Sequence, residues 1–285
     1  MNNKTFFQTP KGSNKWYNYI FLFFLVGLLA AILSLPVYFI KSADGTYQKY
    51  FKDLLPSALM FLSLFWVFKW LHQRSALSLI NANKIRWKRI VWAMGCFGSI
   101  LLFLELANWL CNPSLYQFSF NSATFFQFMV ISLVLIPFQA AAEELLMRGY
   151  YLQGIAWATK RPWIAVIITS VFFGLLHLAN PEIEEFGWPF IFGYIFMGIA
   201  AGIMTIMDDG TELAIGLHIV NNLYSAIIVS FTSSSLQTNT LFFIKDYNPT
   251  FWSIVATISL LLFLAIAHKK YGWGSYKLLF ERLDR

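Results

Sequence analysis

Charged residues are scarce in this sequence of 285 residues. Asp, Glu, Lys and Arg make up 12% of the chain, whereas hydrophobic residues make up 58%. A soluble domain usually carries about 25% charged residues, so this composition excludes an ordinary soluble protein. Long apolar runs recur along the whole chain, which is typical of a protein that crosses a bilayer several times as helices. The sequence therefore predicts an all-α, polytopic membrane protein.

Cysteine is also scarce. Cys96 and Cys111 both lie in or beside one apolar segment, and they have neither the number nor the spacing of a disulfide framework or a metal site. A cleavable signal peptide is not apparent, because Tyr19–Ile40 is too long for the apolar core of one. The net charge of +7 does not indicate nucleic acid, because basic residues in loops next to anionic lipid explain it better.

The apolar segments predict about eight transmembrane helices. They are Tyr19–Ile40, Leu54–Leu71, Ile90–Leu110, Thr124 to about Ala158, Trp163–Leu178, Trp188–Met207, Leu213–Phe231 and Phe251–His268. The fourth is expected to extend out of the bilayer and to end before Pro162, because proline resists a continued helix. No internal repeat and no soluble domain stand out. Residues 1–285 are therefore expected to form one membrane domain, with a motif-bearing core at about 124–231.

The positions of Lys and Arg predict the orientation of the chain. With the N-terminus inside, the inner segments carry 17 of these residues and the outer loops carry 4. Because basic residues collect on the cytoplasmic side, both termini are expected in the cytoplasm of a multi-pass protein of the cell membrane.

Two features inside the apolar segments predict contacts between helices. Glu105 lies within the third segment and is expected to form an interfacial or interhelical hydrogen bond. Gly198 and Gly202 have the spacing that lets two membrane helices approach closely. A glycine-rich apolar helix without such a contact is an equally good interpretation of that pair.

The stretch Ala140–Gly149 interrupts an apolar run with Glu143, Glu144 and Arg148. Ionisable groups at membrane depth cost roughly 2.5–3.5 kcal/mol each to insert, so they are candidates for function. The alternative is a helix leaving the bilayer, with Glu144 and Arg148 as a surface pair four residues apart.

Three more polar residues follow in later segments: His177, His218 and Asn222. A single histidine in such a position usually only forms a hydrogen bond between helices, but polar groups within a membrane tend to face one interior together. Glu143 and His177 each lie roughly 25 Å of helix from the turn between the fourth and fifth helices, at 1.5 Å per residue, and so at matching depth. His218 fits this depth less easily, because it lies only about two turns inside its helix. The side from which the site opens stays undecided.

These residues resemble the signature of a known family. The three motifs are Glu-Glu-x-x-x-Arg (Glu143, Glu144, Arg148), Phe-x-x-x-His (Phe173, His177) and His-x-x-x-Asn (His218, Asn222). In order and in placement on the fourth, fifth and seventh spans they are similar to the CAAX protease and bacteriocin-processing family, also called CPBP or Abi. The resemblance covers about Gln139–Asn222.

The resemblance implies an intramembrane endopeptidase that hydrolyses a membrane-associated peptide or protein with activated water. It implies that Glu143 is the general base and that His177 helps to hold the water. It also implies that His218 and Asn222, which share a helix face, supply donors for the oxyanion. Glu144 and Arg148 are interpreted as structural support. The substrate and the use of prenylated proteins stay undecided.

The same Glu and His residues leave open a zinc site and two alternative functions. Glu143, His177 and His218 could bind zinc, but the sequence has no His-Glu-x-x-His pair and no cysteine near the site, so we favour a mechanism without a cofactor. A transporter could use buried Glu and His in a proton relay, although many transporters show an internal repeat. A non-catalytic immunity protein that keeps the scaffold is the other alternative.

Overall fold

The computed structural model describes residues 5–7 and 12–283. Lys4, Lys11 and Arg285, which contribute to the charge asymmetry, lie outside the described residues. The longer helices are α1 (Trp16–Ser34), α2 (Tyr47–His72), α3 (Trp87–Cys111), α4 (Ser122–Glu144), α8 (Trp188–Asp208) and α10 (Pro249–Tyr271). The shorter helices are α5 (Leu152–Thr159), α6 (Pro162–Leu176), α7 (Pro181–Phe186) and α9 (Glu212–Ile227).

Shorter elements connect these helices. The 3-10 turns are η1 (Thr5–Phe7), η2 (Leu35–Phe39), η3 (Ala76–Leu79), η4 (Pro113–Leu115) and η6 (Tyr276–Leu279), and η5 (Leu145–Tyr151) is a π-helix. Three strands of three residues each, β1 (Tyr116–Phe118), β2 (Val229–Phe231) and β3 (Phe242–Ile244), form a small sheet in the order β1-β3-β2. β3 pairs antiparallel with β1 and parallel with β2. This sheet joins polar loops that the sequence analysis left without structure.

The predicted fold class, a polytopic helical membrane protein, is confirmed. Among the described residues, six helical segments are long and apolar enough to cross a membrane. The fifth and seventh expected spans are also helical, but as α6 and α9 they have only 15 and 16 residues. Exposed side chains such as Phe24, Trp66 and Phe103 cover the outer helix faces, where lipid would surround them.

The fourth span is confirmed as one helical stretch, Ser122–Thr159, of 38 residues. The side chain of Asn121 caps its start by accepting a hydrogen bond from the backbone of Ala123 at 3.0 Å. Its middle, η5, is wound as a π-helix, which the hydropathy pattern did not predict. Such π segments are rare and frequently lie at functional sites.

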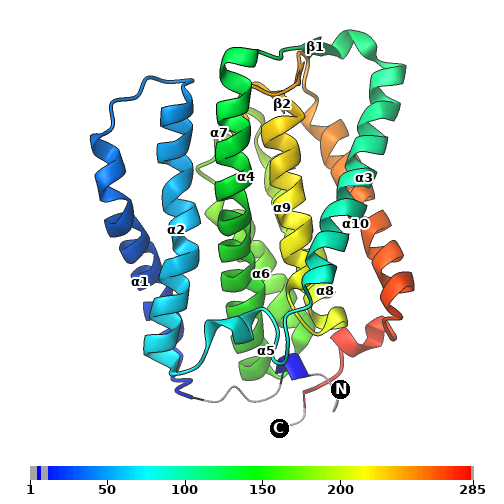
Figure 1. Cartoon of the computed structure of the whole chain (residues 1–285). Coiled ribbons are helices and arrows are strands. Elements are labelled where there is room, and N and C mark those ends of the chain that lie inside the picture. The colour runs from blue at the N-terminus through cyan, green and yellow to red at the C-terminus, as the bar shows by residue number, and fades with distance from the viewer. Residues whose placement is uncertain (1–4, 8–11, 284–285) are drawn as a thin grey trace.

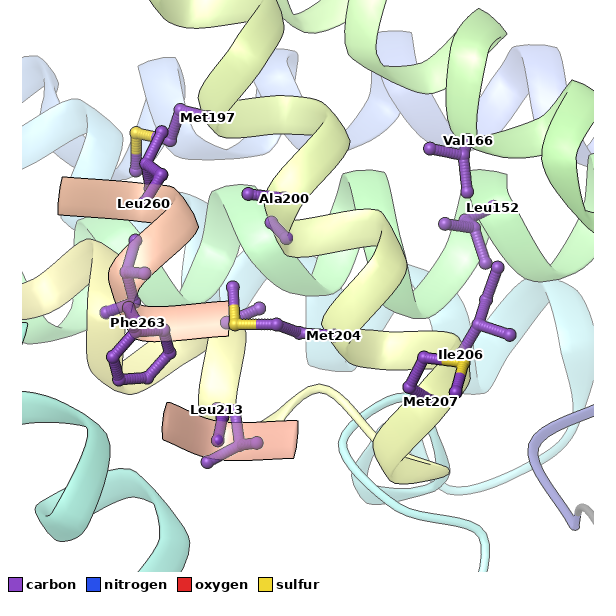
Figure 2. Packing of buried hydrophobic residues seen from close by; sticks show 14 of the residues in the cluster. Leu152, Val166, Met197, Ala200, Met204, Ile206, Met207, Leu213, Leu260 and Phe263 are labelled. Atoms are coloured by element: carbon purple, nitrogen blue, oxygen red, sulfur yellow. The ribbon is translucent and has the colours of Figure 1, made fainter. Parts of the chain in front are cut away.

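Helices α4 and α9 stand side by side at the centre of the bundle (Figure 1). Helices α1 and α2 lie on one side of this pair and α3 and α10 on the other, while α6 and α8 pack against each other. The largest buried cluster includes Met204, Leu213 and Phe263 from α8, α9 and α10, which point toward one another in Figure 2. The central pair therefore has protein on several sides, as polar groups at membrane depth require.

The turn between α8 and α9 is largely buried and is tied to the segment before α3. Thr211 is fully buried, and its backbone N–H donates to the carbonyl of Ile80 at 2.9 Å. Glu212 is also fully buried and forms an ion pair with Arg86 at 2.6 Å. His218 lies near the Glu143–Glu144 pair although it is only two turns into its helix.

The interhelical contacts expected from the sequence are present. Glu105 of α3 accepts hydrogen bonds from the hydroxyls of Tyr116 and of Tyr224 on α9. Gly198 of α8 lies against α6, since a Cβ built on this glycine would be 2.9 Å from the Cα atom of Ser170. The close approach predicted for the glycine pair is therefore confirmed at Gly198.

We predict that Gly198→Ala lowers the thermal stability of the protein in detergent, because the added methyl group overpacks the α6–α8 contact at a cost of about 1–3 kcal/mol. Gly193→Ala on the same helix is the matched control, since no atom lies within 4 Å of its built Cβ. It should be neutral or stabilising by up to ~1 kcal/mol. Equal melting temperatures for the two variants would contradict the assignment of a close contact.

Candidate active site

Glu143 lies in the last turn of α4, where its carboxylate is held from one side only. Gln139, one turn earlier, donates a hydrogen bond to Glu143 Oε1. The other oxygen, Oε2, lies 3.8 Å from His218 Nε2 and is buried without a hydrogen bond from any described residue. The side chain as a whole keeps 22% of its surface exposed. A buried carboxylate oxygen without a donor is suited to receive one from a water molecule or a substrate.

Glu144, the next residue, is completely buried. Its Oε1 accepts a hydrogen bond from Arg148 Nη1 at 3.2 Å and from His218 Nδ1 at 2.8 Å. Arg148 is also completely buried, and its guanidinium lies over the ring of Phe173 at 4.5 Å. The alternative of a surface pair is therefore wrong, although the predicted spacing of the pair is confirmed.

His218 joins the two carboxylates of α4 to α9. Its Nδ1 donates to Glu144, which leaves Nε2 as the ring nitrogen nearest Glu143. Nε2 can donate a hydrogen bond while Nδ1–H is held by Glu144 only if both ring nitrogens carry protons. Glu144 thus fixes both the position and the tautomer of this imidazole.

His177 directly follows the last residue of α6, so it caps the predicted fifth helix and does not lie within it. Its Nδ1 is 2.7 Å from the carbonyl of Phe173, to which it donates. The neutral ring therefore has a lone pair on Nε2. The ring stacks on Tyr194 with the centroids 4.1 Å apart. Backbone and aromatic contacts thus fix the orientation of this second histidine.

Asn222 lies one turn after His218 on α9, and its side chain is held at both ends. Its Nδ2 donates to Gln139 Oε1 at 3.0 Å, and its Oδ1 accepts from Asn221 Nδ2 at 3.2 Å. Gln139 therefore connects Asn222 to Glu143 through one amide group. One N–H of the Asn222 amide stays available for another acceptor.

A cavity of about 720 Å³ brings these side chains together. Glu143, His177, His218 and Asn222 line it, whereas Glu144 and Arg148 lie behind its wall. The lining continues to surface residues of three connections, among them Asp44, Pro181 and Ser235. These connections lie at the end of the bundle that carries the small sheet, away from the described terminal segments (Figure 1). The site therefore opens toward that end.

Three polar residues of this cavity were not predicted as site residues. Gln139 could have been found, because it is a polar side chain four residues before Glu143 and so on the same helix face. Tyr194 and Glu182 come from α8 and the short helix α7, and no sequence pattern connects them to the motifs. The hydroxyl of Tyr194 donates to Glu182, and the ring of Tyr194 stacks on His177.

The donor set does not fit a zinc ion. Glu143 and His218 approach each other to 3.8 Å, and His177, whose Nε2 lone pair is free, is not grouped with them as a third ligand among the described residues. Within residues 5–7 and 12–283, no group of three His, Cys, Asp or Glu side chains has the arrangement of a metal site. Structural and catalytic zinc sites need at least three such ligands.

Comparison with known proteins agrees with the motif analysis. Residues 124–224 match the family model described as "Type II CAAX prenyl endopeptidase Rce1-like", which confirms the resemblance over the segment that carries the site. The chain is also 26% identical, over 291 aligned residues, to the uncharacterized protein YyaK of Bacillus subtilis (strain 168), covering 93% of this chain and 97% of that relative. No solved structure matches the chain.

We predict that Arg148→Met strongly destabilises the protein, because it leaves the fully buried Glu144 without its cation. Breaking a buried ion pair in this way costs about 3–5 kcal/mol. Lys49→Met is the matched control, because Lys49 and Asp53 form an exposed pair at the same spacing, 2.7 Å apart. An exposed pair is worth about 1 kcal/mol or less. Thermal unfolding in one detergent would compare the two variants. An equal decrease in melting temperature for both would contradict the structural role of Arg148.

Proposed function

We propose that this protein is an intramembrane endopeptidase in which Glu143 activates a water molecule to hydrolyse a peptide bond. The observation that carries the proposal is the Glu143 carboxylate itself. It has one oxygen held by Gln139 and the other free of described donors, and it lines a cavity that two histidines and an asparagine share. The family match supports a protease similar to CAAX proteases at this site.

Glu143 is the proposed general base. Water needs a base to attack a peptide carbonyl, and a carboxylate within hydrogen-bond distance of the water can accept its proton. Glu143 Oε2 is the available acceptor, because Oε1 already receives the hydrogen bond from Gln139. His177 presents the lone pair of Nε2 in the same cavity, so it can accept the second hydrogen of the water and orient it.

Asn222 and His218 are the proposed donors to the oxyanion that forms during the attack. Asn222 has a free N–H after its bond to Gln139, and its orientation is fixed by Asn221. His218 can add a donor from Nε2 when both of its ring nitrogens carry protons. Donors that are already in place stabilise the developing charge without further reorganisation.

The proposed mechanism is independent of metal, and the proposed location is the cell membrane with both termini in the cytoplasm. The charge asymmetry of the loops supports this orientation. Since the cavity opens at the end opposite to the described terminal segments, the orientation places its mouth on the outer face. The proposed substrates are membrane-associated peptides or proteins that are accessible from that side.

We predict that Glu143→Gln lowers the rate of peptide cleavage at least 100-fold, because general base catalysis typically contributes ~10²–10⁴ in rate. Asn222→Ala should lower kcat roughly 10²–10³-fold with little change in KM, since an oxyanion donor acts in the transition state. Asn221→Ala removes only an orienting hydrogen bond and should cost about tenfold or less. Purified protein in nanodiscs, incubated with a quenched-fluorescence peptide library, would provide the rates.

The comparison requires that each variant melts within a few degrees of the wild-type protein. Glu184→Gln serves as the control, because Glu184 is exposed and does not line the cavity. A well-folded Glu143→Gln protein that cleaves at the wild-type rate would refute the mechanism. So would activity that is lost with a chelator and restored by zinc.

The orientation gives a separate prediction. In a protein whose Cys96 and Cys111 are replaced by Ser, a cysteine at exposed Glu184 should react with a membrane-impermeant maleimide on intact cells. A cysteine at exposed Lys84, at the opposite end, should react only after the cells are lysed. The reverse pattern would show that the cavity opens to the cytoplasm.

A further inference from the structure

The cavity wall is acidic although the whole chain carries a net charge of +7. Besides its histidines and tyrosines, the ionisable lining comprises five carboxylates and one ammonium group, namely Asp44, Asp53, Glu105, Glu143, Glu182 and Lys49. Lys49 is already neutralised by Asp53 at 2.7 Å. The remaining carboxylates give the cavity an excess of negative charge, and a cleft lined by one sign of charge concentrates ligands of the opposite sign.

Glu182 is a carboxylate of this wall that is almost completely buried. Only 3% of the residue is exposed. Its Oε1 accepts hydrogen bonds from the hydroxyl of Tyr194, from Ser235 Oγ at 2.8 Å and from Asn180 Nδ2 at 3.4 Å. Its Oε2 is buried and receives no hydrogen bond from the residues that the structure describes. Buried charges are normally paired, so this oxygen is suited to receive a positive group.

Glu182 is connected to the proposed catalytic residues through a short series of contacts. Its partner Tyr194 stacks on His177 at 4.1 Å, and His177 lines the same cavity as Glu143. A positive group bound at Glu182 would therefore lie next to Tyr194, whose ring stacks on His177. The surface around the mouth has the same sign of charge, because exposed Glu184 and Glu185 lie on the same short helix.

We propose that Glu182 forms a subsite for a positively charged side chain, lysine or arginine, of the peptide substrate, which enters from the end opposite to the terminal segments. This inference rests on the proposed peptidase function and adds the class of its substrate. Ser235, Asn180 and Tyr194 already hold Oε1 of Glu182. Oε2 is therefore the oxygen left to bind the incoming cation.

The test measures binding without cleavage. Full-length protein with Glu143→Gln, in nanodiscs of zwitterionic lipid, is mixed with either of two pools of randomised decapeptides that differ only in a central Lys or Gln. We expect the Lys pool to bind about tenfold more tightly, the magnitude of a charge-assisted hydrogen bond. Adding Glu182→Gln should abolish this preference, whereas adding Glu184→Gln should leave it unchanged.

The controls separate this subsite from a structural role of Glu182. If Glu182 only supports Tyr194 and His177, its substitution should weaken both pools equally, and that result would overturn the proposal. The proposal would also be overturned if the preference for lysine persisted after Glu182→Gln. It would be overturned likewise if the protein with Glu143→Gln alone bound both pools equally. If the preference depends on Glu182 but wild-type protein cleaves neither pool, the subsite stands and the peptidase function fails.

Discussion

The structure depends on one buried electrostatic contact, the three-way junction of Glu144, Arg148 and His218. Arg148 balances the charge of Glu144 within one helix, and His218 uses the same carboxylate oxygen to join α9 to α4. Neither Glu144 nor Arg148 has any exposed surface, so each would be a costly isolated charge without the other. The close approach of Gly198 to Arg148 keeps α8 near enough to exclude solvent from the pair. The positions of the catalytic candidates follow from this junction.

The adjacent glutamates have different environments because consecutive residues on a helix point about 100° apart. Glu144 faces the packed interior, where it binds Arg148 and holds His218 in position. Glu143 faces the cavity, where one of its oxygens has no donor among the described residues. Gln139 then connects this free carboxylate to Asn222, so that the proposed base and the proposed oxyanion donor are held by one amide. The Glu144–Arg148 pair is held rigidly behind the cavity wall, whereas the Glu143 carboxylate faces the cavity and can meet a reacting group. A preorganised site requires both features.

The sequence was sufficient for six of the eight expected spans and for the residues that meet, because both follow from local patterns. Apolar length predicts spans, and polar residues at membrane depth must share an interior, which brings Glu143 and His218 together. The remaining features depend on tertiary contacts. No periodic signal in the sequence marks the π-helix after Glu144, the buried turn before α9 or the pairing of β1 with β3. Tyr194 and Glu182 reach the site only because α7 and α8 fold back over α6.

The two ends of the bundle differ in a way that explains why the cavity has one mouth. At the end near the terminal segments, Asp208 binds Arg86 and Arg89 and accepts a hydrogen bond from Trp273, and these contacts hold α3, α8 and the C-terminal segment together. At the opposite end, polar connections and a three-stranded sheet surround the cavity without closing it. Ion pairs thus seal the basic end, and carboxylates line the open one. In the proposed mechanism this asymmetry admits water and peptide from one side while the bundle stays sealed on the other.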